Sequence, residues 1–260
     1  MPIKRAYCDV GSRQLHYRSN FNRAAPVLLL LHQSPSDSAM YENLMAELDA
    51  EFWLIAPDNP GFGQSDSLPD GFDLAACATA VEALLKDLQV ESCFVFGHHT
   101  GASIAVQFVT DASMQVPRLA LCGPTLLSPQ LQASLPERAR PFAMDECGSH
   151  LTGMWARMRG KESGTAFELS QREVLSAFAA GDNYLQAYIA VTEQDYAAQL
   201  QALTCPTLVF AGTEDILYPQ LQASYELLQQ GNMQIIDGAG SYVCDRQAPA
   251  VADLLREFFL

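Results

Sequence analysis

Short apolar segments alternate along the chain with longer segments in which apolar residues recur every three or four positions. The first pattern is typical of buried strands and the second of amphipathic helices. Their alternation predicts an α/β fold, with a mostly parallel sheet covered by helices on both faces. The predicted central strands are Val27–His32, Phe52–Pro57, Cys93–Gly97, Leu119–Gly123, Thr207–Gly212 and Met233–Asp237.

Two further strands are expected near the N-terminus, where Ala6–Val10 and Gln14–Arg18 flank the turn residues Gly11-Ser12. This arrangement is typical of a hairpin, and it brings the sheet to eight strands. The predicted helices of the core are Ser38–Leu48, Leu74–Leu88, Gly101–Thr110, Leu221–Gln229 and Ala248–Phe259.

The alternation stops between Pro124 and about Gln201, where no segment resembles a strand and prolines separate short helical patterns such as Arg172–Ala180 and Tyr184–Tyr196. We therefore predict a core formed by residues 1–123 and 202–260 and an inserted helical subdomain formed by residues 124–201. The cationic residues of the insertion are interpreted as solvated helix faces rather than ligands. They are Arg138, Arg140, Arg157, Arg159, Lys161 and Arg172.

Composition narrows the possible partners. The 260 residues are 49% hydrophobic, and 15 Lys and Arg stand against 30 Asp and Glu, for a formal charge of −15. Such a chain can bury a full core, and it would be repelled by nucleic acids and by anionic membrane surfaces. No signal peptide is evident, and the longest apolar run, Val27–Leu31, is too short to span a bilayer. Seven cysteines without CxxC spacing indicate reduced thiols, so we expect a cytoplasmic protein; the oligomeric state is not determined by the sequence.

One strand leads directly into Gly97-His98-His99-Thr100-Gly101 and then into a predicted helix. Glycines on either side of a central residue permit a sharp strand-to-helix turn that exposes the central side chain near the positive end of the helix. This segment resembles the nucleophile elbow of the α/β-hydrolase fold family, whose central residue is usually Ser. Here that position is occupied by His99.

Two loops strengthen the resemblance. Residues 58–66, Asp-Asn-Pro-Gly-Phe-Gly-Gln-Ser-Asp, are similar to the family's Asp-x-Pro-Gly-x-Gly-x-Ser loop. Residues 212–219 fit the Gly-x-x-Asp-x-x-x-Pro loop, which implies that Asp215 is the acid of the triad. The insertion lies where the family has its lid.

The final triad position departs from the family pattern. Residues 238–249 match the segment that carries the catalytic His, but Ser241 stands where that His is expected. The resemblance therefore implies a triad of His99, Asp215 and Ser241 in which the nucleophile and the base have exchanged places.

The resemblance also assigns supporting residues. It implies an oxyanion hole formed near Gln33, Ser34 and Thr100. Residue His32 lies in the oxyanion loop, where its expected role is mainly structural, and it is also a candidate for contact with substrate. The other substrate-binding candidates are His150 and Trp155 in the insertion. His98 is expected to point away from His99. We expect neither a metal site nor a nucleotide cofactor, because no carboxylate or Cys spacing and no phosphate-binding glycine loop is present.

Three hypotheses remain open. In the first, His99 activates the Ser241 hydroxyl, which forms an acyl-enzyme. In the second, which we favour, His99 acts as an acid or base on a small, largely apolar organic substrate in a hydrolase, lyase or isomerase reaction. In the third, catalysis has been lost and the fold binds a small ligand or a protein partner.

Overall fold

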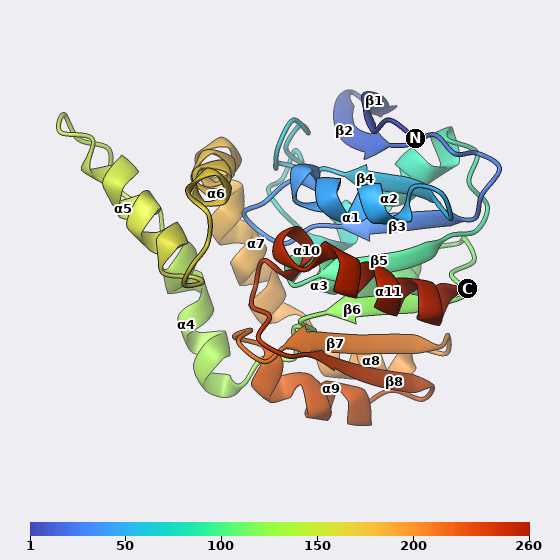
Figure 1. The fold of residues 1–260 in the computed structure, drawn as a ribbon. Coiled ribbons are helices and arrows are strands. Elements are labelled where there is room, and N and C mark those ends of the chain that lie inside the picture. Colours follow the sequence, from blue (N-terminus) through green and yellow to red (C-terminus); the bar gives the residue numbers. More distant parts are fainter.

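The computed structural model describes residues 1–260, and its centre is a single eight-stranded sheet (Figure 1). The strand order is β1-β2-β4-β3-β5-β6-β7-β8, in which β2 is antiparallel to both neighbours and all other pairs are parallel. The predicted mostly parallel α/β sheet is confirmed. Its strands are β1 (Lys4–Val10), β2 (Arg13–Ser19), β3 (Val27–Leu31), β4 (Trp53–Pro57), β5 (Phe94–His98), β6 (Leu119–Cys122), β7 (Thr207–Gly212) and β8 (Gly231–Ile236).

Helices cover both faces of the sheet (Figure 1). On one face lie α2 (Leu74–Asp87), α3 (Thr100–Asp111) and α8 (Tyr196–Ala202), and on the other lie α1 (Glu42–Leu48) and α11 (Ala248–Phe259). The remaining helices of the core are the short α9 (Leu221–Glu226) and α10 (Val243–Arg246), with single 3₁₀ turns at Ser38–Tyr41 and Tyr218–Gln220.

The two faces explain why the central strands are apolar at every position. In β3, Leu29 and Leu31 pack beneath α2 and α3, whereas Leu28 and Leu30 pack beneath α1 and α11. Successive side chains of a strand point to opposite faces, so a sheet that is covered on both sides needs apolar residues throughout. All four leucines are fully buried, and truncation of any one to Ala is expected to cost about 2–5 kcal/mol of stability.

The inserted segment forms four helices beyond the carboxyl ends of the strands (Figure 1). For two of them, α4 and α5, no bounds were predicted from the sequence, because the prolines were interpreted as separating short helical patterns. Pro129 instead occupies the first turn of α4, where the missing N–H costs nothing, and Ser128 caps the helix. The four helices are α4 (Pro129–Ala139), α5 (Ser149–Arg159), α6 (Phe167–Ala180) and α7 (Asp182–Glu193).

Helix α8 lies apart from the other helices of the segment that the sequence placed in the insertion. It packs against α3, and Leu200 is fully buried in the core on that face of the sheet. The predicted boundary at residue 201 is thus later than the point at which the chain rejoins the core. No helix of the structure combines the length and the apolar character that crossing a bilayer requires.

The loop that follows β4 is held by a buried carboxylate. Asp58 accepts hydrogen bonds from the backbone N–H of Ser38 and of Gln64, both at 2.8 Å, and its Oδ2 lies 2.8 Å from Nδ1 of His16. A Cβ on Gly63 would collide with the Asp58 carboxylate, which explains the glycine. Burial alone would raise the pKa of Asp58, but the hydrogen bond from His16, the nearby His32 and the two N–H groups lower it to about 2.

Replacement of Asp58 by Asn tests this arrangement. Because the pKa is lower in the folded chain than the ordinary 3.8, the carboxylate stabilises the fold above about pH 4, and this contribution of about 2 kcal/mol is lost as the pH falls toward 2. We expect D58N to lower the free energy of unfolding by at least this amount at pH 7, and the difference from the parent to shrink between pH 5 and pH 2. Urea unfolding at several pH values measures it. The exposed Asp70 provides the control, D70N, and a D58N deficit that stays constant down to pH 2 would contradict the prediction.

Candidate functional site

The sharp turn between β5 and α3 places His99 at the carboxyl edge of the sheet. His99 has φ 49° and ψ −115°, a conformation that costs a non-glycine residue about 1–3 kcal/mol. Both flanking glycines are required by close packing. A Cβ on Gly101 would collide with the carbonyl oxygen of Leu31, and one on Gly97 would collide with that of Gly101. The elbow predicted from the sequence is present.

The His99 ring is hydrogen-bonded directly to Asp215, which follows β7. Nε2 of His99 lies 2.7 Å from Oδ2 of Asp215, and Oδ1 of the same carboxylate accepts the N–H of Leu217 at 2.8 Å. Burial would raise the pKa of Asp215, but the charge and hydrogen bond of His99 and the N–H of Leu217 hold it below its ordinary value. The ionised carboxylate accepts the Nε2–H proton, and Nδ1 of His99 makes no hydrogen bond within the chain.

Gly123, at the end of β6, makes room for this ring. It has φ +58°, and a Cβ there would collide with Cδ2 of His99 and come within 2.5 Å of its Nε2. The sequence identified Gly123 only as the end of a strand. No local signal could have shown that it lies beneath His99, because the contact joins two different strand ends.

His98 differs from expectation. It was predicted to point away from its neighbour, but the ring centroids of His98 and His99 are 4.5 Å apart. His98 is fully buried, its Nδ1 lies 3.8 Å from Sγ of Cys244, and its Nε2 has no partner. Burial, together with the neighbouring His99, lowers the pKa of His98 well below its ordinary value, so the ring is neutral.

The side chains that could hold a metal ion are His98, His99 and Asp215, whose ligand atoms all lie within 4.8 Å of one another. An ion bound there would have to replace the hydrogen bond between His99 and Asp215. That bond already occupies Nε2 of His99 and Oδ2 of Asp215. The expectation of no metal site remains a prediction.

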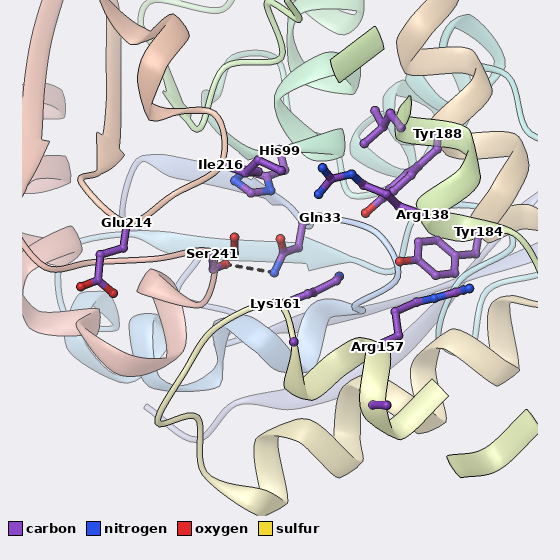
Figure 2. A pocket seen from close by; sticks show the side chains of 13 residues that line it. Gln33, His99, Arg138, Arg157, Lys161, Tyr184, Tyr188, Glu214, Ile216 and Ser241 are labelled. Atoms are coloured by element: carbon purple, nitrogen blue, oxygen red, sulfur yellow. Dashed lines mark hydrogen bonds between the residues drawn. The ribbon is translucent and has the colours of Figure 1, made fainter. Parts of the chain in front are cut away.

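Ser241 lies in the same cavity as His99 but makes no hydrogen bond with it. Instead, its backbone carbonyl accepts Nε2–H of Gln33 at 3.1 Å, as the dashed line in Figure 2 shows. The direct pairing of His99 with Ser241, which the acyl-enzyme hypothesis needs, is therefore not present. Asp215 reaches the imidazole directly because the ring turns toward β7 over Gly123.

The three residues predicted for the oxyanion hole all lie beside His99. Gln33 lines the main cavity, and Ser34 and Thr100 line a smaller adjoining cavity of about 60 Å³, which His99 also lines. Thr100 is the first residue of α3, so its N–H has no acceptor within the helix and lies at the positive end of the helix dipole. The Thr100 N–H and the N-terminus of α3 can therefore stabilise a negative charge that develops on a bound substrate.

The main cavity has a volume of about 490 Å³ and lies between the carboxyl edge of the sheet and the inserted segment (Figure 2). Its size suits a small organic molecule. Five of its 13 lining residues are hydrophobic, and the lining includes residues that the sequence had assigned to solvated helix faces or had not singled out. These are Arg138, Arg157, Lys161, Tyr184, Tyr188 and Glu214.

Three residues expected to contact substrate lie outside this cavity. His32 is fully buried, with Nδ1 2.8 Å from the carbonyl oxygen of Gln33 and Nε2 accepting the N–H of Asn59 at 2.8 Å, so it braces two loops. The ring of His150 packs edge-on against Phe178, and that of Trp155 stacks on Phe167. None of the three lines the cavity, and their assignment to substrate binding stays a prediction.

Comparison with known proteins identifies the family. The model of the alpha/beta hydrolase fold matches residues 26–245. The chain belongs to the α/β-hydrolase fold family. Among its relatives in the family, the AB hydrolase superfamily protein YisY of Bacillus subtilis is 26% identical over 208 residues, covering 74% of this chain and 75% of that protein. The soluble epoxide hydrolase of Corynebacterium sp. is 37% identical over 92 residues, covering 35% of this chain and 32% of that protein.

Solved structures agree with this family assignment at the level of the fold. A thermophilic esterase from Thermogutta terrifontis superimposes with a TM-score of 0.78 and 23% identity, covering 98% of each chain. The α/β-hydrolase fold predicted from the elbow and its two companion loops is thus confirmed.

Replacement of Gly123 by Ala tests the support of the His99 ring. We expect the added methyl group to displace the imidazole and break its hydrogen bond to Asp215, with loss of the slowly exchanging His Nε2–H signal in NMR spectra. G238A is the matched control, since Gly238 also has positive φ (+65°) but no atom lies within 4 Å of the added group. Both variants are expected to lose about 1 kcal/mol from backbone strain. A G123A spectrum that keeps the parent signal would disprove the role assigned to Gly123.

Proposed function

We propose that this chain is a small-molecule enzyme in which His99, held by Asp215, acts as general acid and base. The observation that carries the proposal is the 2.7 Å hydrogen bond between a buried, ionised Asp215 and an imidazole held on a strained turn. Positioned acid and base groups of this kind supply about 10²–10⁴ of rate enhancement.

The proposed proton transfer uses Nδ1 of His99. Asp215 accepts Nε2–H and so fixes the ring orientation, which leaves Nδ1 to take a proton from a carbon or from a water molecule. The resulting imidazolium is stabilised by the adjacent carboxylate. A carbon that loses its proton leaves an enolate, whereas a water molecule that loses its proton adds as hydroxide to a carbonyl carbon and gives a tetrahedral alkoxide. The N-terminus of α3 at Thr100 stabilises either anion, and the protonated Nδ1 then gives its proton to another carbon of the enolate or to the leaving group whose bond breaks. Base-assisted hydrolysis, elimination and isomerisation all follow this scheme.

Conventional serine esterase chemistry is not part of the proposal. The position that the resemblance gives to the nucleophile is occupied by His99, and Ser241 stands in place of the usual base. Without a hydrogen bond to His99, the Ser241 hydroxyl lacks the base that would activate it.

A ligand-binding protein without catalysis is the second candidate, and the absent hydroxyl at the elbow favours it. A site kept only for binding, however, gains nothing from a bulky residue at φ 49°, where glycine would relieve the strain. We also propose a cytoplasmic location, which is supported by seven cysteines that form no disulfide.

Replacement of His99 by Ala tests the proposed base. Turnover of activated esters and proton–deuterium exchange into enolisable ketones, followed by absorbance and NMR, are the two readouts. We expect H99A to lower the rate on a responsive substrate at least ~100-fold and D215N to lower it ~10-fold or more, because the ring loses its orientation. H150A is the control, since His150 lies outside the cavity. Unchanged rates in H99A, or no turnover by the parent across both panels, would favour the ligand-binding function.

Labelling by a fluorophosphonate separates the two catalytic hypotheses. We expect the intact protein to gain no covalent adduct, since the Ser241 hydroxyl makes no hydrogen bond to His99, whose Nε2 is bonded to Asp215. Intact-protein mass spectrometry measures this, with a conventional serine esterase as positive control. Stoichiometric modification of Ser241 would contradict the proposal and establish the acyl-enzyme hypothesis.

A further inference from the structure

The cavity beside His99 gathers positive charge in a chain that carries twice as many acidic as basic residues. Arg138 from α4, Arg157 from α5 and Lys161 just after α5 all line it, whereas Glu214 is its only acidic residue. In Figure 2, Glu214 lies across the cavity from the arginines, and its carboxylate points away from them.

None of the three cations is neutralised by a carboxylate of the chain. Arg140, two residues beyond Arg138, pairs with Glu137 and points to solvent, with 68% of its side chain exposed. Arg157 donates to the carbonyl of Arg140 at 2.8 Å and lies 4.1 Å over the Phe142 ring, while its Nη1 is buried without a partner. The side chains of Arg138 and Lys161 form no ion pair and no hydrogen bond, and the Lys161 ammonium lies 5.9 Å from the centroid of the Tyr184 ring. Both head groups therefore keep hydrogen-bond donors that a ligand can use.

The position of Lys161 is set by its neighbour. Glu162 is buried, pairs with Arg246 and accepts the N–H of Tyr242 at 3.0 Å, which ties this segment to the loop that carries Ser241. Glu162 is fixed in the protein, and Lys161 is directed into the cavity.

Figure 2 shows how the polar groups of the inserted segment lie in the cavity. The guanidinium of Arg138 is directed toward His99, and the Lys161 ammonium is directed toward Tyr184. An arginine fork and an ammonium that line the same cavity can bind a planar carboxylate, with a tyrosine hydroxyl as a further donor.

We propose that the substrate of this site is a small organic acid whose carboxylate is bound by Arg138 and Lys161 while its reacting carbon lies against His99. The inference rests on the proposed function in calling the ligand a substrate, and it replaces the largely apolar molecule expected from the sequence. Two side-chain cations favour a carboxylate over a phosphate, because the cavity lining contains no glycine-rich loop of N–H groups. The cavity of about 490 Å³ holds such an acid with room for an uncharged remainder.

Matched acids and esters test this proposal by isothermal titration calorimetry. The probes are 4-oxopentanoate, 5-oxohexanoate and monomethyl glutarate, each paired with its neutral methyl ester, and glycerol 3-phosphate as the phosphate probe. We expect the acids to bind at least ~10-fold more tightly than their esters, and their affinity to fall with added salt.

Charge-removing variants locate the contact. K161M and R138M should each weaken binding of the acids about 10-fold, leave the binding of the esters unchanged, and together abolish the preference for acids. The matched control is R140M, which removes the same charge from the solvent side of the same chain segment and should change affinity less than ~2-fold. Circular dichroism confirms that each variant is folded.

Several results would overturn the inference. They are equal binding of acids and esters, no binding of any acid, acid binding that survives in the K161M/R138M double variant, or tighter binding of glycerol 3-phosphate than of the carboxylates. H99A separates this inference from the proposed function. This variant should bind the acids as tightly as the parent does but should not turn them over. If the parent binds the acids and no His99-dependent reaction is found, the catalytic proposal is refuted and the carboxylate-binding inference stands.

Discussion

The close packing of α3 against the ends of β3 and β5 is the constraint on which the site depends. Gly97 and Gly101 have no side chains, so the helix N-terminus approaches the backbone of Leu31 until a single added methyl group would collide with it. The chain can then pass from strand to helix only through a sharp turn, and His99 takes the strained φ of 49° that results. The same packing aims the positive end of α3 at the space beside the imidazole.

Two kinds of electrostatic arrangement surround this turn. Asp58 and Asp215 are buried carboxylates that remain ionised, because histidine and backbone N–H groups replace the hydration they have lost. The cavity differs, because its cations Arg138 and Lys161 have no carboxylate of the chain as a partner. The buried carboxylates hold loops and the His99 ring in place, and the unpaired cations leave binding capacity for a molecule that the chain does not itself supply.

Much of the fold could be predicted because its signals are local. A strand covered on both faces must be apolar throughout, so β3 and β7 were placed to within a residue or two. The bounds of α4 were not predicted, because Pro136 resembles a break when it is seen without the helix around it. The hydrogen-bond partners of His32 could not be predicted for a related reason. The hydrogen bonds to Gln33 and Asn59 that occupy its ring exist only once two loops meet.

The sequence by itself determined the family, the sheet and the chain positions of His99, Asp215 and Ser241. The glycine and loop motifs that identify them consist of residues close together along the chain, so they can be recognised without the fold. Only the tertiary structure decided which of these side chains meet. His99 and Asp215 are 116 residues apart, and they are joined because β5 and β7 end at the same edge of the sheet and Gly123 leaves space for the ring between them. The cations of the cavity come from separate parts of the insertion, so their convergence is a property of packing, which no spacing along the chain records.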